Sequence, residues 1–206
     1  MQLTKPLLIL ASLCEYVIAY PFGAGGCTVG NTAVQGPHLT RSVTTGSLEA
    51  GGFTVTLDNA IGLVADQESA FTVGKANALT ITGTKPFKGF LLRLGETGGV
   101  VTDMALSGTG PDIQAAMVCT GIEGVGGVTH TSNSDKTIIS PTLKLDTVAS
   151  ALPLDVTIVV SNSGTVSEYY YSRFLLNAVL PGSLPVVPVT SAPVQTSNPT
   201  PAPVLP

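Results

Sequence analysis

The chain has 206 residues, a formal net charge of −4 and only 11 % charged residues. Lysine and arginine form no cluster, so we expect no binding to nucleic acid through neutralised phosphates. The 23 glycines and the many β-branched residues, with few helix formers in helical register, indicate an all-β protein rich in turns.

The first 19 residues have the pattern of a secretory signal peptide. Lys5 supplies a positive charge, residues 7–14 form a compact apolar run, and Val17 and Ala19 suit a peptidase that cleaves before Tyr20. The alternative is a membrane anchor, but the apolar run is far shorter than the roughly 20 residues that cross a bilayer. We therefore expect a secreted, extracellular protein with no membrane span in the mature chain.

Cysteine usage follows from that cleavage. Cys14 leaves with the signal peptide, so the mature chain keeps Cys27 and Cys119. In an oxidising secretory route an isolated pair most simply forms a disulfide, and a reactive thiol would need a basic neighbour that neither cysteine has. The bridge would close a loop of about 90 residues, for which chain-entropy estimates give roughly 4 to 5 kcal/mol.

Between residues 29 and 180, short β-segments are separated by Gly, Asn and Asp. Residues 53–57 and 78–82 alternate apolar and hydroxyl side chains, which places one face in a core and the other toward water. Residues 87–94 follow the second segment after a turn sequence, so we expect these two to form adjacent strands. Further strands are expected at 115–119, 137–140, 156–160 and 169–179. This spacing favours a single antiparallel, immunoglobulin-like β-sandwich over residues 20–180.

Three segments fall outside the predicted strands. Residues 111–117 offer an alternative helix start at Pro111, and residues 59–74 are predicted as a loop with at most a short strand. Residues 181–206 consist mainly of Pro, Val, Ser and Thr and carry no charge, so we expect a disordered, extended tail. The tail is either a plain extension or an O-glycosylated stalk.

Residue types that carry catalytic or metal chemistry are sparse. No Gly-x-Ser-x-Gly sequence occurs, the glycines at 124–127 lack dinucleotide-loop spacing, and no acid/base pair stands out. His38 and His130 are the only histidines, too few for a metal site when both cysteines are oxidised. We expect His130 to hydrogen-bond the backbone near the bridge. The chain is therefore predicted to be no enzyme and to hold no metal or cofactor.

Gly89 lies inside the apolar segment 87–94 and permits two interpretations. A glycine there marks a β-bulge or a close backbone approach inside the sandwich, or it opens a groove for a ligand. We favour the close approach, and we expect Phe87, Phe90 and Leu92 to be core residues and not a ligand platform.

Three consecutive tyrosines form the one aromatic cluster of the chain. On a strand, Tyr169 and Tyr171 share a face while Tyr170 takes the opposite one. Such tyrosines either belong to the core with their hydroxyls at its rim or stack against sugar rings. The second alternative makes Tyr169, Tyr171 and Arg173 the candidate ligand-binding residues, provided that the tyrosines face solvent.

Several short motifs occur in a fixed order. Residues 20–24 read Tyr-Pro-Phe-Gly-Ala and are followed by Cys27 and Pro37-His38; residues 87–92 read Phe-Lys-Gly-Phe-Leu-Leu. Then come Val118-Cys119, Val128-Thr129-His130 and Lys136. This order resembles the Reeler (reelin-type) domain family over residues 20–179. The chain departs from the family at one point, because it has no tryptophan after that lysine.

The resemblance implies an extracellular β-sandwich module. Reeler domains occur in matrix and guidance proteins, in insect defence proteins that bind microbial surfaces, and in front of membrane ferric-reductase-like proteins whose haem domains are missing here. We therefore expect a secreted binding module that recognises glycans or microbial surface polymers. The alternative is a structural or adhesive matrix protein with a glycosylated tail, which binds a protein partner.

Overall fold

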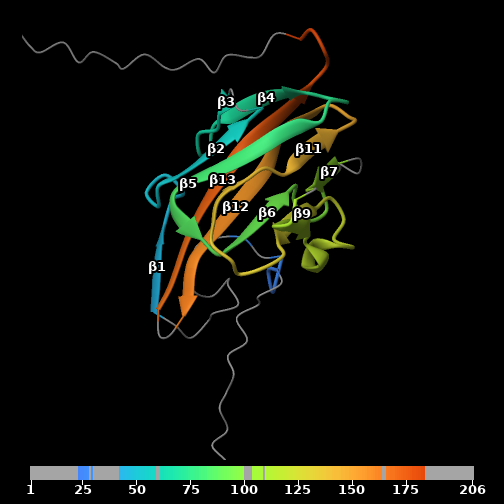
Figure 1. Cartoon of the computed structure of the whole chain (residues 1–206). Helices are drawn as coiled ribbons and strands as arrows, with labels where there is room; N and C mark the ends of the chain where they lie inside the picture. The colour runs from blue at the N-terminus through green and yellow to red at the C-terminus, as the bar shows by residue number, and fades with distance from the viewer. Residues whose placement is uncertain are drawn as a thin grey trace, which may run out of the picture.

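Two β-sheets packed face to face make up the described part of the molecule (Figure 1). The computed structural model describes residues 23–27, 29, 42–58, 61–99, 104–108, 110–163 and 166–183. The predicted signal peptide and the predicted tail beyond residue 183 lie outside these residues. Within them the all-β, two-sheet prediction is confirmed, and the single helical element is a short 3-10 turn, η1 (Met117–Cys119).

The larger sheet is built around two long strands, and seven strands belong to it among the described residues. Its order is β1 (Ser42–Gly46), β13 (Val166–Val179), β12 (Ala149–Ser163), β6 (Gly89–Leu94), β9 (Gly126–His130) and β8 (Ile113–Ala115), and β4 (Glu68–Thr72) also pairs with β13. β12 and β13 are antiparallel, whereas β1 and β4 lie parallel to β13 at successive positions along its other edge. The sheet is thus mainly antiparallel, with two parallel pairings that the sequence did not predict.

The smaller sheet covers one face of the larger one. Its order is β3 (Ile61–Gly62), β2 (Phe53–Leu57), β5 (Asn77–Phe87), β11 (Thr142–Leu145) and β7 (Met104–Ser107), and β10 (Lys136–Ile139) also pairs with β5. β10 and β11 follow one another along the same edge of β5, on either side of Pro141. A proline cannot donate to the ladder, which explains why the pairing changes there.

The core lies between the two sheets, and strand alternation decides which residues fill it. In β2, Phe53, Val55 and Leu57 are buried while Thr54 is exposed, as the sequence pattern predicted. The larger sheet contributes Phe90, Leu92, Leu94, Leu154, Val156 and Ile158 to the same core. Each fully buried side chain of this size contributes about 1.5–3 kcal/mol relative to an exposed one. Phe87, Phe90 and Leu92 are therefore core residues, as expected.

The expected adjacency of residues 78–82 and 87–94 is wrong, because β5 and β6 belong to different sheets. Lys88 is the single residue between the two strands, and the common tight hairpins need two residues. The chain therefore crosses from the smaller to the larger sheet instead of turning back. There the backbone N–H of Lys88 donates to the carbonyl of Val159 on β12, at 2.9 Å.

The remaining predicted strands are found with shifted bounds. Residues 137–140 correspond to β10, and residues 156–160 and 169–179 are parts of the longer β12 and β13. The strand predicted at 115–119 is wrong beyond Ala115, because the N–H of Cys119 donates to the carbonyl of Ala116 and closes the turn η1. Residues 111–117 contain β8 in place of the alternative helix, and the described residues 61–74 contain β3 and β4.

Candidate binding site on the outer face of the larger sheet

The disulfide predicted from the cysteine count is present. Cys27 and Cys119 are joined by an S–S bond of 2.06 Å. Cys119 is buried and packs with Leu91 and Ala116 in a small apolar cluster separate from the main core. Leu91 alternates with the core residues Phe90 and Leu92, so this cluster lies on the surface of the larger sheet that faces away from the smaller sheet. We call this surface the outer face.

The tyrosine cluster divides between the core and the outer face, as alternation predicts. Tyr170 belongs to the main core, where its ring centroid lies 5.7 Å from that of Phe53. Tyr169, Tyr171 and Arg173 occupy the alternate positions of β13 and therefore share the outer face. β12 lies beside them, with Val159, Thr157 and Asp155 as their respective partners in register.

Tyr171 and Arg173 meet at a carboxylate that the sequence pattern did not single out. The Tyr171 hydroxyl donates to Oδ1 of Asp155 at 2.5 Å. Nε of Arg173 donates to the same oxygen at 2.8 Å, and Nη2 of Arg173 donates to Oδ2 at 3.1 Å. Nη1 of Arg173 reaches Oε1 of Glu96 at 3.1 Å. The bidentate contact holds the guanidinium plane in one orientation against the sheet.

Burial and charge in this network shift two pKa values. The side chain of Asp155 is fully buried, and that of Arg173 is 35 % exposed. Burial, together with the hydrogen bond to Asp155, raises the pKa of Tyr171 to about 12. The hydrogen bond to Asp155 raises the pKa of Arg173, so this side chain stays cationic at every pH at which the protein folds.

We expect Tyr171 to ionise about two pH units above an ordinary tyrosine, whose pKa is 10.0. A raised folded-state pKa means that the phenol contributes stability fully below pH 10 and that this contribution is lost as the pH rises from about 10 to 12. The ultraviolet difference between the wild type and Tyr171→Phe, followed across alkaline pH, isolates this ionisation. A difference spectrum with its midpoint near pH 10 would contradict both the burial of the phenol and its hydrogen bond to Asp155.

Tyr169 differs from Tyr171 in being buried. It is 5 % exposed, burial raises the pKa of its phenol, and its hydroxyl has no hydrogen-bond partner among the described residues. A ring so buried offers no surface on which a sugar could stack. The outer face therefore presents Tyr171 and Arg173, both half-buried, and Tyr169 can take part only through its hydroxyl.

Two more polar atoms of the outer face resemble the Tyr169 hydroxyl. Oγ1 of Thr157 and Nε of Arg93 are also buried without a hydrogen-bond partner in the described part of the chain. Sequence reasoning missed Arg93, Asp155 and Thr157. Asp155 and Thr157 were detectable as polar residues that interrupt an apolar run at 152–160, but their relation to Arg93 depends on strand register.

His130 hydrogen-bonds the backbone, as predicted. The backbone N–H of Phe90 donates to Nδ1 of His130 at 3.2 Å, and the His130 side chain lies over Gly89. A Cβ at Gly89 would come within 3.0 Å of the imidazole carbon Cε1, so the glycine permits a close approach and not a groove. The other histidine, His38, lies outside the described residues. Within them no group of three or more potential metal ligands occurs.

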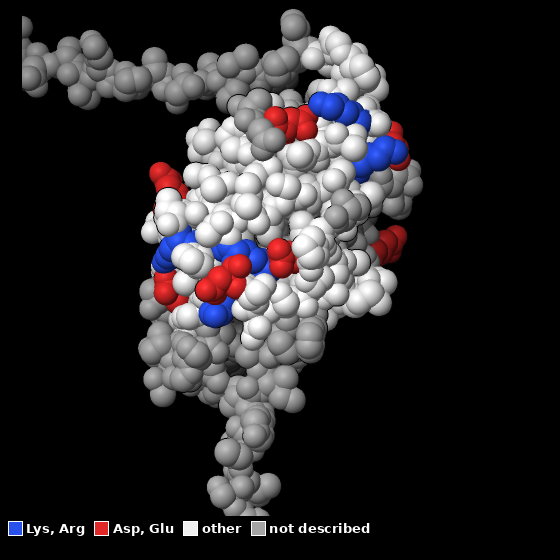
Figure 2. Space-filling view, viewed as in Figure 1, with Lys and Arg blue, Asp and Glu red and all other residues white. Residues whose placement is uncertain are grey.

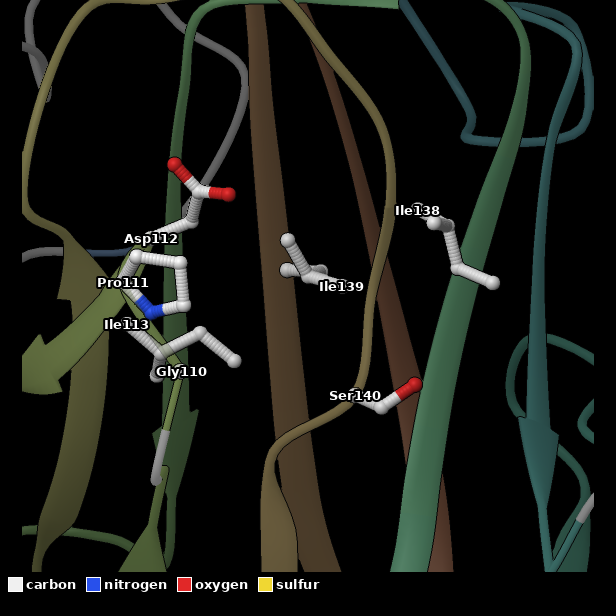
Figure 3. A pocket seen from close by; sticks show the side chains of 7 residues that line it. All are labelled: Gly110, Pro111, Asp112, Ile113, Ile138, Ile139 and Ser140. Carbon is white, nitrogen blue, oxygen red and sulfur yellow. The ribbon is translucent and has the colours of Figure 1, made fainter.

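Figure 3 shows a pocket of about 220 Å³ between the segment Gly110–Ile113 and the strand β10. Asp112 is the one charged residue of its lining, and Oδ1 of Asp112 lies 4.0 Å from Nζ of the buried Lys136. The hydroxyl of Ser140, which also lines the pocket, is within hydrogen-bond distance of Thr80 Oγ1 at 3.1 Å. Asp112 and Ser140 thus each contact a residue outside the lining, Lys136 and Thr80 respectively.

Comparisons with known proteins give matches among solved structures. The human F-spondin reeler domain, fragment 1, has a TM-score of 0.44 at 11 % identity and covers 68 % of this chain and 96 % of its own. The Reelin-N domain of F-spondin has a TM-score of 0.42 at 10 % identity, covering 67 % and 93 %, respectively. Fragment 2 of the human domain has a TM-score of 0.42 at 13 % identity, covering 66 % and 95 %.

No protein-family model and no curated protein matches the chain. None of the described residues belongs to a helix long and apolar enough to cross a membrane. Reeler domains are among the solved structures to which this chain is similar.

Proposed function

We propose that this chain is a secreted, non-enzymatic binding module that recognises glycans or microbial surface polymers through the outer face of the larger sheet. The observation that carries the proposal is the network of Tyr171, Asp155 and Arg173, which holds a half-buried phenol and a half-buried guanidinium on the same carboxylate. Groups that are held in place before binding lose little conformational entropy when a ligand arrives.

Two further observations support the compartment and the kind of ligand. A disulfide that persists requires an oxidising environment, as in the secretory route, and here it joins segments 92 residues apart. The outer face combines the guanidinium of Arg173 with the half-buried aromatic ring of Tyr171. Guanidinium donors suit sugar hydroxyls, and aromatic rings suit the apolar faces of sugar rings.

The test is binding of the full secreted chain to a panel of chitin, β-glucan and oligogalacturonate fragments and bacterial cell-wall polymers. We expect saturable binding to at least one of them, weakened roughly ten-fold or more by Tyr171→Ala and by Arg173→Lys, which keeps the charge but loses the bidentate geometry. Lys144→Met is the control, because Lys144 pairs with Asp146 on the smaller sheet, far from the outer face in the fold.

A second candidate function is adhesion through the outer surface of the smaller sheet. Thr54 and Thr82 pair in register there and are exposed, and Ile138, next to Thr82, is 57 % exposed. β5 lies in front in Figure 1, and in the same view Figure 2 shows uncharged surface between two groups of charged residues. An uncharged surface of this kind suits contact with another protein.

The panel separates the two functions. No binding by a folded wild-type chain across all polymers would overturn glycan recognition and make adhesion the leading account. Binding that survives Tyr171→Ala and Arg173→Lys unchanged would retain glycan recognition but move it off the outer face.

A further inference from the structure

Three residues of the outer face each carry a buried polar atom that has no hydrogen-bond partner among the described residues. These atoms are the hydroxyl of Tyr169, Oγ1 of Thr157 and Nε of Arg93. Thr157 pairs with Tyr171 on one side and with Leu91 on the other, which makes Tyr169 and Arg93 its diagonal neighbours. Diagonal neighbours of an antiparallel pair are roughly 7–8 Å apart, within reach of long side chains. The three residues thus form a diagonal group across β13, β12 and β6, with Thr157 in the middle.

The lack of partners has an energetic meaning. A buried polar group that makes no hydrogen bond is destabilising, and few such groups occur in folded proteins. Three of them on one sheet surface, next to the ordered Tyr171–Asp155–Arg173 network, form a concentration that packing alone does not require. A ligand that bonds to these atoms would recover this cost.

Arg93 also differs from the other cations of the molecule. Among the described lysines and arginines it alone has no described carboxylate within 4.0 Å, whereas the others pair with Asp or Glu. Asp155 is its partner in register on β12, but both oxygens of Asp155 are engaged by Tyr171 and Arg173. Nη2 of Arg93 contacts Oγ1 of Thr97, at 3.4 Å. Arg93 therefore carries a positive charge that no described residue neutralises.

The chemistry of the group indicates what it binds. Nε and a terminal nitrogen of a guanidinium donate two parallel hydrogen bonds, which match the two oxygens of a carboxylate. The hydroxyls of Thr157 and Tyr169 both donate and accept, so they suit the sugar hydroxyls beside such a carboxylate. We propose that Arg93, with Thr157 and Tyr169, binds the carboxylate of a uronic acid residue. This inference rests on the proposed glycan recognition and specifies the class of glycan.

The experiment compares oligogalacturonate with its methyl ester, which has the same sugar rings without the charge. Titration of the full chain should show that the acid binds at least ten-fold more tightly than the ester. Arg93→Met should weaken binding of the acid about 10- to 100-fold, so that the acid no longer binds more tightly than the ester. Arg93→Lys should retain only part of the preference for the acid, because lysine keeps the charge but loses the bidentate geometry. Thr157→Val and Tyr169→Phe each remove a hydroxyl with little change in side-chain volume, and each should weaken binding of the acid. Lys144→Met removes a cation from the other sheet and should change nothing.

The failures are distinguishable. Equal binding of acid and ester by the wild type would overturn the uronic acid site and leave glycan recognition intact. The uronic acid site would also be overturned if neither probe binds while another polymer of the panel does, or if Lys144→Met weakens binding of the acid as much as Arg93→Met. No binding to any glycan by a chain with a normal unfolding transition would overturn both proposals. If free inorganic sulfate binds as tightly as the acid, the site is a general anion site and the uronic acid proposal is overturned.

Discussion

Replacing both Cys27 and Cys119 by serine is expected to lower the free energy of unfolding by roughly 4 to 5 kcal/mol. The bridge joins residues 92 apart in the chain, so its loss greatly increases the freedom of the unfolded state. A loss of this size is a large part of the roughly 5 to 15 kcal/mol that ordinarily stabilises a domain. The double variant should therefore unfold at markedly lower denaturant concentration.

The measurement is equilibrium unfolding in urea, with and without a reducing agent. The reduced wild type should match the double serine variant, because both lack the same cross-link, and reducing agent should have no effect on the variant. A loss below about 1 kcal/mol, well under the loop-closure value, would mean that Leu91, Ala116 and the other residues of the small cluster hold the 23–27 segment in place without the bridge.

Lys136→Met is expected to lower the free energy of unfolding by about 3 kcal/mol. The side chain of Lys136 is 1 % exposed, and its ammonium donates to the carbonyls of Lys88, Ser132 and Ser134 at 3.2, 2.8 and 2.8 Å. Methionine has an unbranched side chain of similar length, but it leaves all three carbonyls without the ammonium donor. Lys88 is the crossover between the sheets, so the loss occurs where the two sheets are joined.

Lys144→Met is the matched control for this variant. Lys144 is 44 % exposed and pairs with Asp146, an exposed ion pair of the kind that contributes less than about 1 kcal/mol. Burial lowers the pKa of Lys136, so the wild type should gain stability relative to Lys136→Met as the pH rises toward the ordinary lysine value of 10.5. Equal stability of the two methionine variants would show that the carbonyls of Lys88, Ser132 and Ser134 find other donors.

Strand alternation explains what could be predicted of the fold. The segment 53–57 alternates so regularly that its predicted bounds are those of β2, and the apolar residues of β6 and β12 fill the expected core. Pairing between strands is a different matter, since periodicity assigns faces and not neighbours. The single residue between β5 and β6 excludes a tight hairpin, and this is the signal that the prediction of adjacent strands overlooked.

The candidate site was predictable in part for the same reason. Alternation placed Tyr169, Tyr171 and Arg173 on one face, but it could not show that Tyr169 is buried there. Asp155 enters the site through its pairing with Arg173 across β12 and β13. Arg93 enters through its pairing with Asp155 across β6 and β12, which depends on register between segments about 60 residues apart. The sequence therefore indicated the strand that carries the site, and the neighbouring strands supply most of its chemistry.

The most direct test of the central claim is a chemical-shift map of the bound glycan on the full chain. The probe is the soluble oligosaccharide of the panel that binds most tightly. If the outer face of the larger sheet is the binding surface, the backbone signals that move should centre on Leu91, Thr157 and Tyr171, while those of Thr54 and Thr82 stay in place. Changes centred on Thr54 and Thr82, or no change with any oligosaccharide, would contradict the account.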